Sequence, residues 1–78
     1  MITAEVSVYP LKTTHAGNII TNAINSLNNG ELEYSVGSIS TRLSGSEEQV
    51  WNGLKDMFRN AQNSGEVSMV ITMTNAAD

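Results

Sequence analysis

The sequence contains no cysteine, one proline, one histidine and only four basic residues. Without cysteine, disulfides and thiolate metal sites are both excluded. No apolar run is long enough to cross a bilayer, and the first residues lack the charged and then apolar pattern of a signal peptide. We therefore expect a cytoplasmic protein with no membrane insertion.

The balance of charge is acidic, with eight acids against the four basic residues and a net charge of −4. Such a chain has little electrostatic attraction to phosphate backbones, so nucleic acid is not an expected partner, whereas a cationic small molecule is compatible. The 78 residues, 40% of them hydrophobic, predict one folded domain over residues 1–78. A domain this small leaves much surface open, which a second copy could cover.

The residues that common catalytic and metal sites require are isolated in this sequence. His15 is the only histidine, and it has neither a neighbouring nucleophile motif nor a second metal ligand. We expect it at the surface or at a helix start, with contact to a ligand at a subunit edge as the alternative. Glu47 and Glu48 fit the first turn of a helix, where the dipole favours acids. The sequence therefore offers no support for a catalytic, metal or nucleotide site.

Hydrophobic periodicity predicts a strand followed by a helix in the first part of the chain. Residues 2–9 alternate between apolar and polar side chains, and Pro10 ends the strand because proline has no N–H for the ladder. Over residues 14–28 the apolar side chains recur every three or four positions, which predicts an amphipathic helix. Gly30 is the expected stop of this helix.

A hairpin, a second helix and a last strand are predicted in the rest of the chain. The hairpin strands are residues 32–36 and 39–44, joined through Gly37 and Ser38. A capping box, Ser46-Glu47-Glu48-Gln49, starts the helix, and Asn63-Ser64-Gly65 ends it. Residues 66–74 then alternate as a strand.

This order predicts an α+β fold, the ferredoxin-like βαββαβ sandwich, in which both helices cover one face of an antiparallel sheet. Right-handed crossovers place the first and third strands in the centre and the others at the edges. The helix-covered face is expected to contain Ile2, Ala4, Val6, Val8, Val67, Met69, Ile71 and Met73. The open face is expected to carry Thr3, Glu5, Ser7, Tyr9, Ser40, Arg42, Ser68, Val70 and Thr72.

The polar open face admits three interpretations: ordinary solvent exposure, a sheet-to-sheet oligomer interface, or a ligand site. Glu5 favours the third, because a mid-strand carboxylate covered by another subunit needs a hydrogen-bond donor or a cation. Arg42 or a bound ligand could be that partner. Trp51, beside the apolar stripe of the second helix, is expected to pack in the core or at its rim.

Four segments together resemble the small thiamine-binding proteins of the YkoF and UPF0045 (DUF77) group. They are Ser7-Val8-Tyr9-Pro10-Leu11, Ile39-Ser40-Thr41-x-Leu43-x-Gly45, Val50-Trp51 and residues 67–74. The resemblance implies a ferredoxin-like fold and association into a homodimer or homotetramer through the open sheet face. It also implies a pocket for thiamine or its hydroxymethylpyrimidine portion at the subunit interface, with no catalytic activity and no further cofactor.

The resemblance implies four ligand-binding residues: Ser7, Tyr9, Ser40 and Thr41. Glu5 and Thr72 are added from their expected place on the open face alone. An aminopyrimidine offers acceptors and an amino donor that hydroxyl and carboxylate groups can satisfy, and its thiazolium partner carries a positive charge. Strict alternation turns Thr41 toward the helices, so a bulge near Gly37-Ser38 or a twist at the strand end is needed to bring it to the open face.

The chain also departs from its relatives. Many UPF0045 members have an acid where Ser44 stands and a basic residue near the end, and YkoF-like repeats tend to have an acid at the position of Gly37. A structural or regulatory homo-oligomeric module without a small-molecule ligand is therefore the main alternative. An enzyme is the third hypothesis, for which the sequence supplies only isolated acids and His15.

Overall fold

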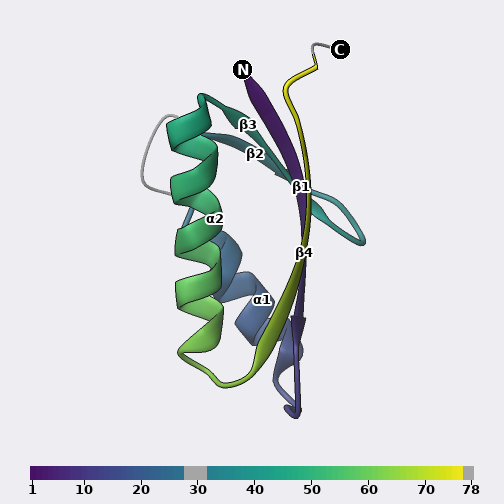
Figure 1. The fold of residues 1–78 in the computed structure, drawn as a ribbon. Helices are drawn as coiled ribbons and strands as arrows, with labels where there is room; N and C mark the ends of the chain where they lie inside the picture. Colours follow the sequence, from purple (N-terminus) through teal and green to yellow (C-terminus); the bar gives the residue numbers. More distant parts are fainter. Residues whose placement is uncertain (28–31, 77–78) are drawn as a thin grey trace.

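The computed structural model describes residues 1–27 and 32–76. Its elements in chain order are β1 (Ile2–Pro10), α1 (Ala16–Asn25), β2 (Glu33–Val36), β3 (Thr41–Gly45), α2 (Glu47–Gln62) and β4 (Val67–Thr74). The strands form one antiparallel sheet in the order β2-β3-β1-β4, and both helices lie on the same face of it (Figure 1). The predicted ferredoxin-like fold is confirmed, with β1 and β3 in the centre.

The two neighbours of β1 pair with it over different lengths. Residues 2–6 of β1 pair with β3, whereas residues 3–10 pair with β4. Beyond Val6, therefore, β1 is paired on its β4 side alone within the part of the chain that the structure describes. This leaves one side of β1 open near the end of the hairpin.

The core lies between the sheet and the two helices. Alternation along the strands and the three- to four-residue repeat along the helices bring one face of each element to it. Its buried hydrophobic residues are Ala4, Val6, Ile19, Ala23, Leu27, Leu43, Val50, Leu54, Met57 and Ala61. Burial of such side chains stabilises a fold by about 25 cal/mol per Å² of apolar surface.

The hairpin differs from the prediction at the start of its second strand. β3 begins at Thr41 rather than at residue 39, and Ile39, which strict alternation would turn toward the helices together with Thr41, is 86% exposed. The reason is the connection, which takes four residues instead of two because the Gly37 N–H donates to the Ser40 carbonyl oxygen at 2.8 Å. Ile39 therefore belongs to the loop.

Helix α1 is shorter than the predicted range of residues 14–28. His15 occupies the N-cap position without a side-chain cap, and Gly17 follows in the first turn, so nothing local extends the helix toward residue 14. The helix ends at Asn25, although Leu27 beyond it is still buried. The expected stop at Gly30 lies outside the described residues.

Helix α2 is stabilised at both ends as the sequence predicts. The Ser46 hydroxyl accepts from the Gln49 N–H at 3.1 Å, and the Gln49 side-chain oxygen accepts from the Ser46 N–H at 2.9 Å. Past the C-cap residue Asn63, Gly65 has a φ of +133°, a conformation that favours glycine, and the chain turns into β4. In the described part of the chain, neither helix has the length and apolarity needed to span a membrane.

The capping box gives a prediction about stability. Ser46→Ala removes the acceptor for an otherwise orphaned N–H, so we expect a loss of about 1 kcal/mol in the free energy of unfolding. For a domain of this size that corresponds to a Tm lower by about 4–8 °C in a thermal melt. Ser64→Ala, an exposed serine beyond the other end of the helix, is the matched control and should leave Tm unchanged. Equal losses in the two variants would contradict the capping role.

Candidate functional site

A cavity of about 120 Å³ lies where β1 continues past the end of β3. Its walls come from β1, from the loop of residues 37–40 and from α1. Apolar side chains on β1 and α1 line it, namely Val6, Val8, Ile20 and Ile24. Hydroxyl-bearing residues also line it, namely Ser7, Ser38, Ser40 and Thr41. The cavity thus combines apolar walls with several groups that can both donate and accept hydrogen bonds.

Ser7 connects the two sides of this cavity. Its hydroxyl donates to the Ile39 carbonyl oxygen at 3.0 Å, across the space that a longer β3 would fill. A single side-chain bond of this kind contributes about 0.5–1.5 kcal/mol. Ser7 therefore holds the hairpin loop against the otherwise open side of β1.

Thr41 keeps the orientation that strict alternation predicts. The register of β3 with β1 is continuous from Thr41 to Gly45, so neither a bulge nor a strand-end twist turns the side chain to the open face. Thr41 is only 5% exposed and lies on the helix side of the sheet, where it lines the cavity together with Ile20 and Ile24. It can face the core side and a ligand cavity at the same time.

Glu5 and Thr72 lie on the open face, outside the cavity. Glu5 is directly opposite Arg42 on β3 and Thr72 on β4. Side chains opposite one another in this way have Cβ atoms about 4.5–5.5 Å apart. The carboxylate of Glu5 is therefore flanked by a guanidinium and a hydroxyl group in one row across the sheet.

Tyr9 lies further along β1 on the same face. Residues two apart on a strand are separated by about 7 Å, so Glu5 and Tyr9 flank Ser7 on either side. The structure thus divides the six predicted ligand residues into two groups. Ser7, Ser40 and Thr41 line the cavity, whereas Glu5, Tyr9 and Thr72 lie on the adjacent open face.

From the sequence, some of the residues that line the cavity were predicted only to be part of the hydrophobic core. Ile20 and Ile24 belong to the predicted apolar stripe of the first helix, and no pattern marked them as cavity walls. The available signal was the difference in length between the first strand and its hairpin neighbour, which leaves a gap under that helix. Val36 completes the wall from β2.

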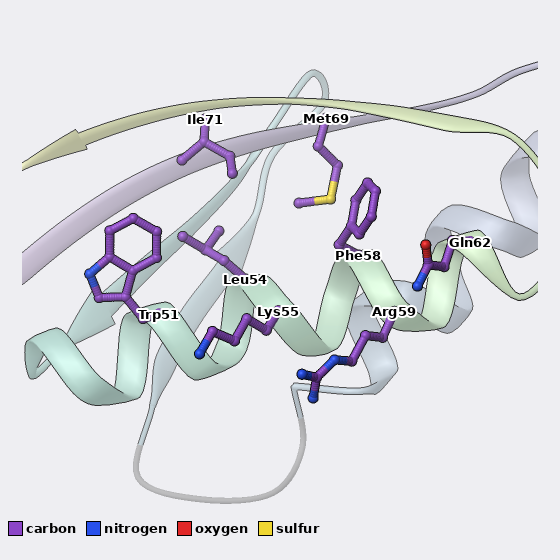
Figure 2. A pocket seen from close by; sticks show the side chains of 8 residues that line it. All are labelled: Trp51, Leu54, Lys55, Phe58, Arg59, Gln62, Met69 and Ile71. Atoms are coloured by element: carbon purple, nitrogen blue, oxygen red, sulfur yellow. The ribbon is translucent and has the colours of Figure 1, made fainter.

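A second hollow, of about 480 Å³, lies between α2 and the edge strand β4. Figure 2 shows Trp51 and Phe58 on the helix facing Ile71 and Met69 on the strand. Ile71 was expected to be covered by the helices, but it is 42% exposed. The reason is the crossover: α2 connects β3 to β4 and packs against β1 as well, so the outer strand is only partly covered.

Fold and cavity define a small ferredoxin-like domain with a ring-sized hollow beside a central strand. The chain belongs to the YKOF-related family, whose model matches residues 1–77. No curated protein matches it significantly.

Several solved structures share the fold. A Streptococcus pneumoniae protein superposes with a TM-score of 0.89 at 19% identity, over 97% of this chain and 87% of the other. A Bacillus cereus domain of unknown function, DUF77, gives 0.84 at 23% identity, over 96% and 75%. A Thermotoga maritima protein, provisionally named for thiamine biosynthesis or salvage, gives 0.83 at 18% identity, over 96% and 83%. At these identities the likeness establishes the fold.

The bond from Ser7 gives a prediction about the mobility of the cavity wall. Ser7→Ala removes the bond to Ile39, so hydrogen exchange at the Gly37 amide, which is bonded to Ser40 across the loop, should become several-fold faster, as expected for a loss of about 1 kcal/mol. Ser68→Ala, an exposed serine on the same face, serves as the control and should leave exchange in this loop unchanged. Exchange that is the same in both variants and the native protein would show that Ser7 does not hold the loop.

Proposed function

We propose that this protein binds thiamine or its hydroxymethylpyrimidine moiety without catalysing a reaction, at a site that a second subunit completes. The observation that carries the proposal is the cavity of apolar and hydroxyl-bearing residues at Ser7, two residues along β1 from Glu5. Membership of the YKOF-related family supports it, as does the provisional thiamine-related name of the Thermotoga maritima neighbour.

The cavity has the size of a single ring. A buried cavity of about 150 Å³ accommodates benzene in another protein, and pockets for drug-sized ligands have volumes of at least about 300 Å³. The 120 Å³ beside Ser7 therefore suits a six-membered ring and is too small for all of thiamine. The pyrimidine is the part that fits: Ile20 and Ile24 would pack against its faces, and the hydroxyls of Ser40 and Thr41 would meet its nitrogen atoms.

The charged part of thiamine would then lie outside the cavity, on the open face. Glu5 and Tyr9 are the groups within reach there, one on each side of Ser7. A carboxylate attracts the thiazolium directly, and an aromatic ring adds a cation–π contribution of about 0.5–1 kcal/mol at an exposed site. The net charge of −4 acts in the same direction on a cationic ligand.

The second subunit is proposed to cover the open face of the sheet. Val70 is 58% exposed on that face, midway along the edge strand β4, and Tyr9 on β1 is also exposed, so the face offers apolar area as well as polar groups. A sheet packed on it would exclude water from Glu5, which has Arg42 and Thr72 opposite and a cationic ligand as a further partner. A homodimer or homotetramer in the cytoplasm is the assembly we propose.

Titration calorimetry with thiamine and with uncharged hydroxymethylpyrimidine tests whether the cavity binds the pyrimidine and the open face binds the charged ring. Thr41→Val keeps the shape of the cavity wall and removes one hydroxyl, so it should weaken both ligands by about five- to tenfold. Glu5→Gln should weaken thiamine by a few-fold, most clearly at low salt, and leave hydroxymethylpyrimidine unaffected.

Thr74→Val, at the far end of the open face, is the matched control and should bind both ligands like the native protein. The absence of heat or thermal stabilisation with either ligand at millimolar concentration would refute the proposal. Equal weakening of both ligands by Glu5→Gln would show that the charge selectivity assigned to it is wrong.

A structural or regulatory homo-oligomeric module is the second candidate, favoured by the exposure of Val70 on an otherwise polar face. On this hypothesis Glu5→Gln and Ser7→Ala change the oligomer mass in light scattering, while neither ligand binds to the native protein. Ligand binding by the native protein excludes this alternative.

A further inference from the structure

The hollow between α2 and β4, called here the edge groove, is a second apolar surface, and it shares no lining residue with the cavity. Its helix wall is Trp51, Leu54 and Phe58, and its strand wall is Met69 and Ile71. Trp51, Phe58 and Ile71 are all exposed. Large apolar side chains gathered in one exposed groove are typical of a contact surface.

The strand beside this groove lacks the features that normally protect a sheet edge. β4 ends the strand order, and its eight residues, VSMVITMT, include no charged residue, proline or glycine. Proteins usually prevent further pairing at an edge with charges, proline, bulges or very short strands. The opposite edge follows this rule, because β2 has four residues and includes Glu33. β4 is therefore the edge suited to accept another strand.

We propose that the occupant is β4 of a second copy of this chain, paired antiparallel across a twofold axis at Val70. This interface joins sheets edge to edge, so it is separate from the packing of sheet faces proposed above. Pairing about Val70 sets Met69 opposite Ile71 of the second copy and Val67 opposite Met73. On the open face it sets Ser68 opposite Thr72. Apolar side chains meet apolar ones on the helix side, and on the open face the two Val70 side chains meet between pairs of hydroxyl groups.

The helices agree with this register. Along the edge groove, Trp51 faces Ile71 and Phe58 faces Met69, so α2 runs antiparallel to β4 (Figure 2). An axis at Val70 therefore passes midway between Trp51 and Phe58, and it brings Trp51 of each copy toward Phe58 of the other. An axis at Ile71 would instead bring the two Trp51 side chains together and leave Phe58 without an aromatic partner.

The expected distance between the two α2 helices leaves room for aromatic side chains between them. β1 of one copy and β1 of the other would lie three strand spacings apart, about 14 Å. Helices above them would exceed the usual contact distance of about 8–10 Å by a few ångströms. Trp51 and Phe58 from both copies are the large side chains available to fill that extra space.

The charges on α2 are also arranged for this pairing. Glu48 lies seven residues before Lys55 on the same side of the helix, and Arg59 lies one turn after it. In the antiparallel pair, Glu48 of each helix comes within about one turn of Arg59 of the other. The two Lys55 side chains meet near the axis, where their long stems can extend into solvent.

Cross-linking tests the register, because the native chain contains no cysteine. Directly opposed positions in an antiparallel pair lie about 4.5–5.5 Å apart between Cα atoms, within disulfide range. When the Met69→Cys and Ile71→Cys proteins are mixed and oxidised, we expect a disulfide-linked heterodimer. Each variant alone is offset by about two residues along the strand and should cross-link poorly. These positions lie on the helix side, where packing of open sheet faces cannot join them.

Sedimentation equilibrium tests the interface without cysteine. Ile71→Lys places a charge in the edge groove at an already exposed position, so the subunits should dissociate at least about tenfold more readily while the far-UV spectrum is unchanged. Arg59→Glu should also weaken association, and the double variant Glu48→Lys with Arg59→Glu should restore it. Thr21→Lys, which adds the same charge at an exposed position on α1, is the control.

The proposal is overturned if Ile71→Lys leaves the subunit mass unchanged, or if the mixed proteins form no heterodimer. Cross-linking by Ile71→Cys alone, or association with a different protein in place of the second copy, also overturns it. Failure of this interface leaves binding in the cavity intact, because the cavity and the edge groove share no lining residue. Loss of thiamine binding in the native protein would in turn not affect the cross-link.

Discussion

The unequal lengths of β1 and β3 determine where this small domain can hold another molecule. β1 has nine residues and β3 five, so the central strand continues past its neighbour. A sheet paired along its full length would close that space with main-chain bonds. Here the hairpin loop turns away, α1 covers the gap with isoleucine side chains, and a ring-sized cavity remains.

Incomplete coverage of the sheet by the helices also explains the edge groove. Two helices cannot shield four strands equally, and α2 packs against β1 and β3 as well as β4. The outer strand is therefore half-covered and carries exposed apolar residues on its helix side. In the described residues, one face of the sheet, its β4 edge and the cavity are all left open, and each is proposed to be filled differently.

Element types and order could be predicted from periodicity because alternation and the three- to four-residue repeat are local properties. Thr41 shows the strength of this reasoning: alternation placed it toward the helices, and the structure agrees. Ile39 shows the limit. Whether a hairpin connection takes two or four residues depends on a bond between Gly37 and Ser40, which no apolar pattern records.

The candidate site could be predicted from the sequence less completely than the fold. The hydroxyl residues could be identified on their strands, but their division between cavity and open face depends on where β3 begins. Ile20 and Ile24 look like ordinary core residues in the sequence, and only the missing strand pairing makes them cavity walls. Ile71 was similarly placed on the correct side of the sheet, while its exposure depends on how far α2 reaches.

The Ser7 hydroxyl has one hydrogen to donate, and the loop carbonyl of Ile39 already receives it. While that bond is intact, the oxygen can only accept from a molecule in the cavity. An exocyclic amino group satisfies this requirement, whereas a ring carbonyl would direct its lone pairs at those of the serine oxygen. Under the proposed function, the loop contact would make Ser7 an acceptor toward the ligand, and at this position it would favour an aminopyrimidine over an oxopyrimidine of the same shape.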